Sequence, residues 1–573
     1  MAELSKAQKD DLLLLEKTCS ENESYRTQVD GKYKEWLEIF LGNQWKSGEG
    51  EAPKPMANYT FSTIRSSVSL LTDNEPQISC KATDSDDLPK AEIVKKGLWA
   101  LWEHQEGNDL LETVLYDSHI YGQGVIKDRW NKDAIGIAGD KGEIETAIIR
   151  PQDFYPSPAA THDIRVIPNC HQAAYLTLGE LAMMFGKDAV KDLKPDGIII
   201  RRANPITGVY ESEIVFKDTD NKVSTPLVTD YAGWRDMGKG VVVKELWIWN
   251  VDLDDYQVII GVPSQNKLFT KENVKNPLEN KTVPYSIIYN YKLNGMFNGI
   301  SEVQLLLPQQ REININKAMV SDHLRLMGKM PWITDYTSDV DVQNLPNSEG
   351  TILFKNQGTE LRKDQPPPLP NDIFKFLADN KFELDTISGI HDVTQGRRPV
   401  GINAGVAIAE LQEAGQIPIR AKARRVQTAL KRRGKIQMQL MQKYYKIERL
   451  KKIASGISQE YFKSDKDYKI DEIKGEYDIS FDLISGLAKT QSSRFNEMLQ
   501  LATVGLVDRR AALEYANVPN REDIIKRMGL ADIINKAMAS GMLNQLGTTD
   551  MSQLQAMMAN MQGKKGGATE SVV

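Results

Sequence analysis

The sequence has few of the residues that build covalent or metal-bound sites. Its 573 residues include three cysteines and six histidines. Cys19, Cys80 and Cys170 lie far apart and share no motif, which predicts free thiols in a reducing cytoplasm, packed as small apolar side chains. No histidine stands at zinc-binding spacing from another ligand, and no HExxH motif occurs. The sequence therefore predicts no metal site and no cofactor.

Long hydrophobic runs are also missing. No stretch of about 18 apolar residues occurs, so we expect no membrane-spanning helix and no membrane partner. Residues 1–17 are charged, with a helical pattern and no signal-peptide core. With 41% hydrophobic and 26% charged residues, the composition is that of a soluble folded protein with material for several cores.

Several stretches match part of a known ligand-binding motif, but each lacks a residue that the motif requires. GWRDMGKG at 233–240 has the spacing of a phosphate-binding loop, but Gly240 stands where Ser or Thr is needed, and a strand-like VVVKELWIW follows. We interpret it as a β-hairpin turn. YGQG at 121–124 lacks the third glycine of a dinucleotide motif and precedes a strand. DTDN at 218–221 and DLDD at 252–255 lack the glycine and glutamate of a calcium loop and fit turns. No catalytic residue is predicted, and nothing argues for an enzyme.

Charge is unevenly distributed along the chain. Residues 396–452 hold fifteen Lys and Arg against three Asp and Glu, so that the rest of a chain of net charge −6 carries −18. Such asymmetry indicates contact with a polyanion or with an acidic neighbour. The alternative is a solvated helix whose charges pair with acidic parts of other subunits. The basic residues of the helical part are Arg420, Lys422, Arg424, Arg425, Lys431, Arg432 and Arg433.

The periodicity predicts an α+β protein that is mainly helical. Helical patterns at 4–41 (one helix or two), 60–72 and 89–121 precede short β-like runs that alternate with turns from 124 to about 290. Helical patterns return at about 300–328 and 371–390, and they flank a compact block with strand-like WIT and TILF. Since both helices return to one place, we expect a hairpin with a small module at its tip.

A flexible loop and a long helical pattern follow this hairpin. The loop contains Arg397 and Arg398 among several glycines, and the helical pattern runs from Ala404 to Tyr445 with a kink expected at Pro418. Strands are expected within 466–484, and helices from 492 onward. No nucleic-acid-binding module is present. If the chain touches DNA, we expect loop arginines to contact phosphates without reading bases.

Several blocks occur in an order that resembles a known family. They include YKEWLEIFLGNQW, IRPQDFYPSPAATHDIRVIP, LLLPQQREININKAMVSDH and ISGIHDVTQGRRPVGINAGVAIAELQEAG. Together they resemble the portal (head-to-tail connector) proteins of tailed bacteriophages, most closely those of short-tailed phages. The resemblance covers nearly the whole chain, and it rests on the order and spacing of the blocks.

The resemblance implies a ring, usually of twelve subunits, at one vertex of the capsid. Double-stranded DNA passes through its channel during packaging and ejection. The implied partners are the terminase large subunit, a tail adaptor, and the major capsid and scaffolding proteins, and the implied location is the virion, with the host cytoplasm during assembly. The implied parts are wing (1–299), stem helices (300–328 and 371–390), clip (329–370), tunnel loop (391–405), kinked long helix with wing strands (406–490), and crown with C-terminal tail (491–573).

The same resemblance suggests which residues carry function. The tunnel loop would face DNA through Gln395, Arg397, Arg398 and Asn403. The clip would dock the motor and then the adaptor through Trp332, Asp335, Asp339, Asp341, Glu349 and Lys355. In the alternative, Arg397 and Arg398 bind acidic groups of a neighbouring subunit and hold the ring closed. Rival functions are another virion structural protein, such as a tail adaptor or internal protein, and a nucleotide-binding enzyme that uses Lys239.

Overall fold

The structure is a computed structural model, and its chain divides into two units, residues 1–488 and 489–573. The structure describes parts of the first unit: residues 5–45, 54–73, 75–82, 88–137, 139–160, 163–203, 210–216, 234–270, 274, 276–278, 281–328, 332–334, 361–363, 367–390, 415–445, 449, 453 and 477–483.

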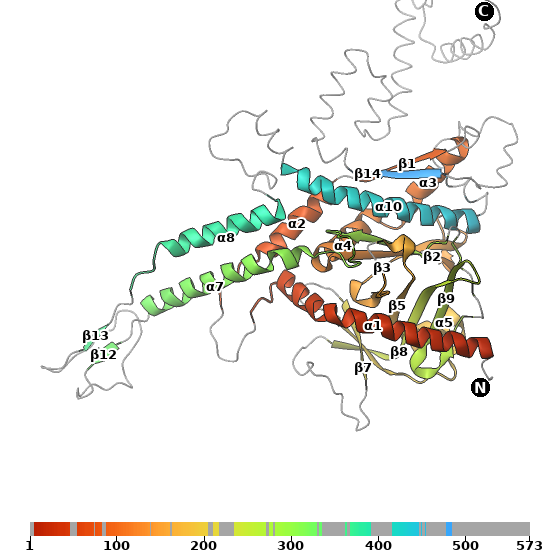
Figure 1. Ribbon diagram of the computed structural model, residues 1–573, viewed down its shortest axis with the longest axis horizontal. Helices are drawn as coiled ribbons and strands as arrows, with labels where there is room; N and C mark the ends of the chain where they lie inside the picture. Colours follow the sequence, from red (N-terminus) through yellow and green to blue (C-terminus); the bar gives the residue numbers. More distant parts are fainter. Residues whose placement is uncertain are drawn as a thin grey trace, which may run out of the picture. The chain divides into compact units, whose positions relative to one another are not determined.

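Two capped helices open the unit (Figure 1). Helix α1 (Lys6–Leu41) begins at a capping box formed by Ser5 and Gln8, and it ends at Gly42, which has a left-handed backbone. It is one helix, so the 4–41 pattern is not broken into two. Helix α2 (Tyr59–Thr72) begins at Asn58, whose side chain accepts a hydrogen bond from the Phe61 backbone.

The predicted helical stretch at 89–121 is two helices. Strand β1 (Gln77–Ala82) leads into α3 (Leu88–His104), and α4 (Gly107–Tyr121) follows after Glu106, which adopts a left-handed backbone. Helix α4 ends at Gly122, where φ is +90° and an added Cβ would collide with the Gly299 backbone. The glycines of YGQG therefore serve a helix end and a close backbone approach rather than a nucleotide.

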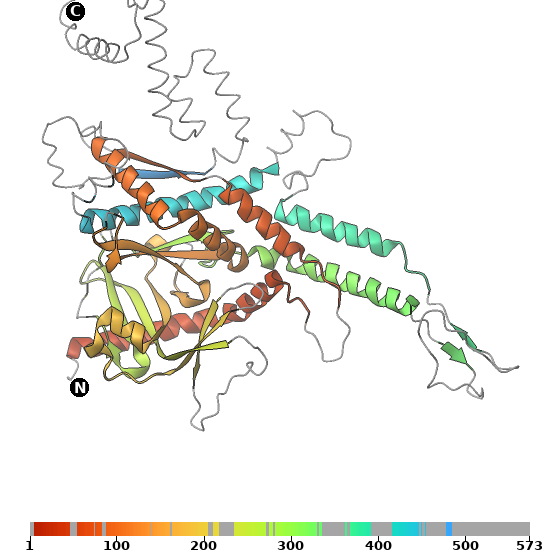
Figure 2. The ribbon, with the colours of Figure 1, turned by 180° about the vertical axis from the view of Figure 1, so that it is seen from behind.

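Two antiparallel sheets form the β-rich part of the unit, and Figure 2 shows them from behind. The smaller sheet has the order β11-β2-β3, and the larger has β10-β9-β8-β5-β4, with β6 pairing to both β7 and β8. The strands are β2 (Gln123–Ile135), β3 (Lys141–Ile149), β4 (Phe154–Pro156), β5 (Asn169–Thr177), β6 (Gly197–Ala203), β7 (Tyr210–Phe216), β8 (Trp234–Asn250), β9 (Asp255–Val262), β10 (Lys267–Leu268) and β11 (Tyr285–Tyr289).

Short helical turns join these strands. They are η2 (Pro151–Asp153), η3 (Ile164–Val166), α5 (Leu178–Phe185), α6 (Lys187–Val190) and η4 (Pro263–Gln265). A capping box of Thr177 and Glu180 begins α5. The turn expected at DLDD lies between β8 and β9, and its Asp254 has a positive φ of 48°.

The interpretation of GWRDMGKG as a hairpin turn was wrong. From Trp234 onward the motif belongs to the 17-residue strand β8. The first part of β8 pairs with β6, and the later part pairs with β5 and β9. Three glycines in eight residues suggested a turn, but a long strand that changes partners accommodates glycine where neighbouring backbones approach closely.

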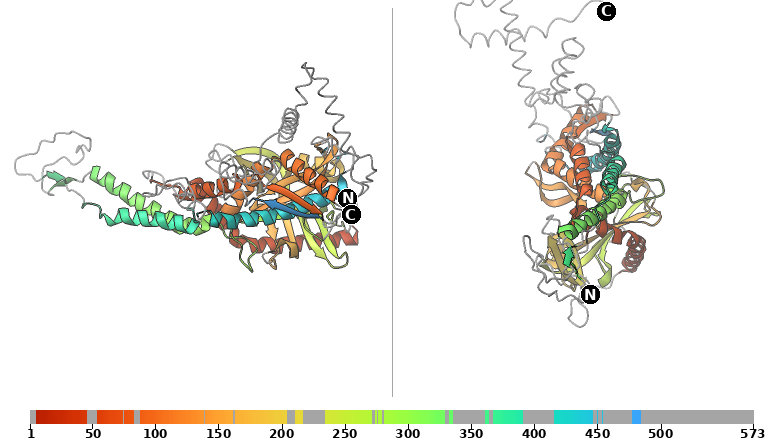
Figure 3. Two further views of the ribbon diagram at one scale, coloured as in Figure 1. Left: turned by 90° about the horizontal axis from the view of Figure 1, so that it is seen from above. Right: turned by 90° about the vertical axis from the view of Figure 1, so that its left-hand side faces the viewer.

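The expected helical hairpin is present. Helix α7 (Glu302–Gly328) contains Pro308 in its early turns, and α8 (Asp372–Ser388) ends at Gly389. The two helices lie side by side, as Figures 1 and 3 show, and Leu306, Ile313 and Leu384 pack between them. At the far end, β12 (Trp332–Thr334) pairs with β13 (Leu361–Lys363). WIT is thus a strand, as predicted, whereas TILF falls outside the described residues.

Helix α10 (Ile417–Tyr444) lies across the hydrophobic core. Pro418 occupies its first turn, where a missing N–H is tolerated, rather than a position well inside a continuous helix as predicted. Strand β14 (Tyr477–Asp482) pairs with β1 and packs on α10 at Gly434. The largest cluster of buried apolar residues joins α1 to α4, α10 and β14, so α10 holds the helical part and the sheets together.

All three cysteines are free, as predicted, and two of them are buried. Cys19 packs with Leu15, Leu246 and Ile259 where α1 crosses the larger sheet. Cys170 belongs to a second cluster, between the sheets, with Phe154 and Tyr285. Burial raises the pKa of the Cys19 thiol to about 12, which makes this thiol unreactive.

Candidate functional site

Most residues predicted for DNA contact and docking fall outside the described residues. They are Gln395, Arg397, Arg398 and Asn403 of the loop, and Asp335, Asp339, Asp341, Glu349 and Lys355 of the tip. Trp332 begins β12 at the end of the hairpin. The seven basic helix residues all lie on α10, and their contacts define the site that the structure can describe.

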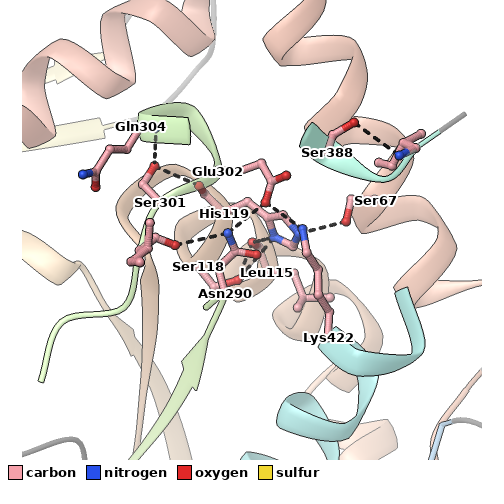
Figure 4. A network of polar contacts seen from close by, with 12 residues as sticks. Ser67, Leu115, Ser118, His119, Asn290, Ser301, Glu302, Gln304, Ser388 and Lys422 are labelled. Atoms are coloured by element: carbon pink, nitrogen blue, oxygen red, sulfur yellow. Dashed lines mark hydrogen bonds and ion pairs between the residues drawn. The ribbon is translucent and has the colours of Figure 1, made fainter. Parts of the chain in front are cut away.

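Lys422 is the centre of a buried polar network at the start of α10 (Figure 4). Its Nζ lies 2.7 Å from an oxygen of Glu302 in the first turn of α7, and both side chains are buried. Asn290, just after β11, donates to the same Glu302 oxygen at 2.9 Å. Burial disfavours the ionised carboxyl, but Lys422 and the hydrogen bonds outweigh it and hold the pKa of Glu302 below its usual value.

His119 of α4 completes this network without carrying charge. Its Nδ1 lies 2.7 Å from the carbonyl oxygen of Leu115, and its Nε2 lies 2.9 Å from the Ser67 hydroxyl. Because a carbonyl only accepts, Nδ1 carries the proton and Nε2 accepts from Ser67. Burial, together with the nearby Lys422, lowers the pKa of His119 to about 3. The histidine is therefore a neutral bridge between α2 and α4.

Arg433 forms a second buried cluster farther along α10. Its guanidinium lies 3.5 Å from Asp128 of β2, and it donates to Gln105 at 2.8 Å and Thr146 at 3.0 Å. Gln437, one turn later, donates to the same Asp128 carboxylate at 2.9 Å. Arg433 and Gln437, on one face of α10, thus both bind the Asp128 carboxylate of the smaller sheet.

Three further basic residues of α10 bind groups of the same chain. Arg432 donates to the carbonyls of Tyr285 and Val283, and Arg425 donates to the carbonyl of Asn290. Burial lowers the pKa of Arg432 to about 10. Lys431 forms a more exposed ion pair with Asp478 of β14 at 2.7 Å. Of the seven, Arg424 is the exposed member.

The basic helix is therefore not a bare cationic surface. Five of its seven predicted residues pair with acidic groups or carbonyls of the same chain, whereas the sequence had suggested a polyanion or the acidic parts of other subunits. Sequence reasoning missed Glu302, Asp128 and Asn290 because they lie more than 100 residues from their partners. One signal was available for Glu302, since an acidic residue in the first turn of a helix is favoured there.

The ends of the 391–414 segment meet at this site. Gly389, which closes α8, has a φ of +68°, and an added Cβ would lie 2.9 Å from the Pro418 ring of α10. The last turn of α8 and the first turn of α10 are therefore in contact. The network around Lys422 lies one turn beyond this contact, so that α7, α8 and α10 converge there.

The described part of the chain contains no group of three or more His, Cys, Asp or Glu side chains able to hold a metal ion. Across these residues, no helix has the length and apolarity required to cross a bilayer.

Comparison with known proteins gives a family. A family model described as Phage P22-like portal protein matches residues 265–570. No curated protein matches. A chain from "Virion of native gene transfer agent (GTA) particle" is 11% identical, with a TM-score of 0.35, and the match covers 84% of this chain and 99% of that one. For "Neck of empty GTA particle computed with C6 symmetry" the values are 10%, 0.37, 80% and 90%.

Similarities at such TM-scores carry no argument, so membership rests on the family model. The matched region includes the hairpin, α10 and the Asn290, Glu302 and Lys422 part of the buried network, and it spans more than half of the 573 residues. This chain belongs to the phage P22-like portal protein family.

Proposed function

We propose that the chain assembles into a closed ring at one capsid vertex, and that double-stranded DNA passes through the ring during packaging and ejection. Family membership makes the protein a structural component of a phage particle. The observation that carries the ring proposal is the surface of the α7/α8 hairpin, which exposes apolar side chains that a lone subunit cannot bury.

The hairpin buries little apolar surface of its own. Leu306, Ile313 and Leu384 are its buried apolar core, with Tyr59 and Leu377 packed against them. More large apolar side chains point outward from the same two helices: Ile315, Met319, Leu324, Phe374, Phe376, Phe382 and Ile387. Monomeric proteins rarely expose so many together, and such surfaces mark contacts between chains. Copies of the same hairpin, repeated around a ring of about twelve, would cover them.

Contact with DNA is assigned to the loop rather than to α10. The α10 cations are largely engaged within the chain, so Gln395, Arg397, Arg398 and Asn403 are the better candidates to line the channel. Such contacts to phosphate are independent of sequence and screened by salt, which suits a polymer that must slide.

The hairpin tip is the proposed docking face. It would bind the terminase large subunit during packaging and a tail adaptor afterwards, through Trp332, Asp335, Asp339, Asp341, Glu349 and Lys355. The wing would contact the major capsid and scaffolding proteins.

Electron microscopy of the purified protein tests the ring. We expect end-on views with cyclic symmetry and a channel wide enough for a duplex. The double variant Phe374→Ser/Phe382→Ser should shift particles from rings to single subunits, because it removes two exposed aromatic side chains from α8. Lys375→Ser, an exposed polar change on the same helix, is the matched control. Compact monomers of the wild type with capsid and scaffolding partners present would refute the ring.

The loop assignment has its own test. Arg397→Ala/Arg398→Ala should leave rings intact and reduce packaging or retention of DNA, because two phosphate-binding charges are lost from each subunit. The measurement is DNA content per head beside ring counts by microscopy. Loss of rings would support the alternative, in which these arginines bind the neighbouring subunit.

A further inference from the structure

The root of the α7/α8 hairpin is attached to the rest of the unit at two polar points along α7. The first is the Glu302–Lys422 pair, which joins the first turn of α7 to α10. The second lies about two turns later, at Gln310. Both side chains are buried, Glu302 at 1% and Gln310 at 0% exposure.

Gln310 acts as the cap of a helix other than its own. Its Oε1 accepts from the backbone N–H groups of Tyr59 at 3.0 Å and Thr60 at 3.2 Å, which begin α2. The Thr60 hydroxyl donates to the same oxygen at 3.3 Å. Its Nε2 donates to the carbonyl of Ala57 at 2.7 Å. The first turn of a helix leaves such N–H groups without helical partners, so the amide of Gln310 caps Tyr59 and Thr60 while the local cap, Asn58, accepts from Phe61.

Asn314, one turn farther along α7, extends this contact to α1. Gln310 donates to its Oδ1 at 3.2 Å, and Asn314 in turn donates to Gln44, which follows the end of α1. Gln44 then donates to Asn58 at 3.3 Å. Four amide side chains thus form one relay from α7 to α1 and α2.

Other contacts at this root are less directional. The apolar cluster of Leu306, Ile313 and Leu384 is small and sets no angle, because apolar packing is non-directional. The ion pair between Arg311 and Glu35 is exposed on both sides, and such pairs contribute little. Amide hydrogen bonds, by contrast, weaken steeply when their angles change.

We propose that Gln310 is the residue that fixes the direction of the hairpin relative to the sheets and α10. A helix held at one point rotates about it, whereas two anchors eight residues apart, about 12 Å at 1.5 Å per residue, define a line. Without Gln310 the second anchor keeps only the hydrogen bonds of Asn314, to Gln44 and from the Ala57 backbone, so the hairpin moves more freely about Glu302. One consequence rests on the proposed function: by fixing the direction of the hairpin, Gln310 also determines the position of the docking tip.

The test is a distance distribution within one subunit. Nitroxide labels are placed on the full chain at Lys375→Cys of α8 and Glu112→Cys of α4, both exposed, in a Cys80→Ala background that leaves the buried Cys19 and Cys170 unlabelled. Labelled chains are diluted with unlabelled wild type, so that the distances are intramolecular whether or not rings form. We expect a single narrow distribution for the wild type.

Gln310→Leu should broaden this distribution about twofold or add a second distance, because the second anchor loses its hydrogen bonds to the first turn of α2. Gln304→Leu is the matched control, since Gln304 is an exposed glutamine on the same helix, and it should match the wild type. Gln310→Glu keeps the acceptor for α2 but not the donor, and its width should lie between the two. If Gln310→Leu does not fold, Asn314→Ala decides by the same criterion. A wild-type width in the folded variant overturns the proposal, whatever the state of the ring.

Discussion

At the scale of single residues, several charged side chains are buried in ion pairs. Lys422, Arg433 and Arg449 are buried, and each meets a carboxylate of another element. Removing two charges from water is costly, so a buried ion pair stabilises the folded protein little more than two apolar side chains would. Removing one partner of the pair, however, strongly destabilises the fold, because the other charge stays buried alone. The pairs of Lys422 and Arg433 determine which residues of α10 face which strands and helices.

The Glu302–Lys422 pair gives the first prediction of stability. Lys422→Met leaves Glu302 buried without its cation and should lower the free energy of unfolding by about 3–5 kcal/mol. The double variant Lys422→Met/Glu302→Leu should recover most of that loss, because no charge stays buried. Urea denaturation measures both. Arg424→Met, an exposed change on the same helix, is the control, and equal losses in the single and double variants would contradict the argument.

His119 predicts a dependence on pH. Its folded-state pKa of about 3 lies below its ordinary value of 6.5, so the folded protein resists a proton that the unfolded chain accepts. The stabilisation is complete above pH 6.5 and is lost as the pH falls towards 3.

Replacing this histidine should flatten the profile. His119→Gln should reduce the slope of unfolding free energy against pH in that window by up to about 1.4 kcal/mol per pH unit. Denaturation at a series of pH values measures it, and His104→Gln, at the exposed end of α3, should leave the slope unchanged. An unaltered slope in His119→Gln would mean that this residue is protonated in the folded state.

At the scale of elements, hydrophobic periodicity predicted the positions of several helices and strands. The expected helices at 300–328 and 371–390 correspond to α7 (Glu302–Gly328) and α8 (Asp372–Ser388). The β-like runs expected between 124 and about 290 include β6 (GIIIRRA) and β9 (DYQVIIGV). Local patterns could not show which residues meet across the chain. Lys422 reads as a solvated charge until Glu302, 120 residues earlier, is placed beside it.

Glycine positions were poor predictors, because the sequence does not show which elements pack around them. GWRDMGKG looked like a turn, but pairing with β6 keeps Trp234–Gly240 extended. Gly434 gave no signal within a helical stretch, although its lack of a side chain is what admits β14. An added Cβ there would lie 2.8 Å from Phe481 and 3.1 Å from Ile479.

Gly434→Ala should therefore loosen β14 from α10. Overpacking of this kind costs about 1–3 kcal/mol, and here it should appear as faster hydrogen exchange in 477–482. Gly179→Ala in α5 is the control, since its added Cβ would meet only the Thr177 hydroxyl at 3.9 Å. Unchanged exchange in β14 would show that Phe481 moves aside freely.

At the scale of the whole molecule, the tip is peripheral to the fold. Strands β12 and β13 pair with each other and with no other described strand. Deleting 333–362 should spare the folding of the rest and abolish binding of the motor and the adaptor. Thermal unfolding and pull-down with each partner measure the two effects. Intact docking would move the docking face elsewhere, and a collapsed melting transition would make the tip part of the fold.

The contact between Gly389 and Pro418 has a consequence for engineering and for sequence divergence. The chain leaves the described body at one point and rejoins it at the same point, so the length of the intervening segment is not prescribed by the distance it must cover. Closing a longer loop between fixed ends costs only about 0.6 kcal/mol per doubling of its length. Replacing 391–414 by a segment of another length should therefore leave the fold of the body unchanged, while the replacement removes Arg397 and Arg398 and with them the proposed contact with DNA.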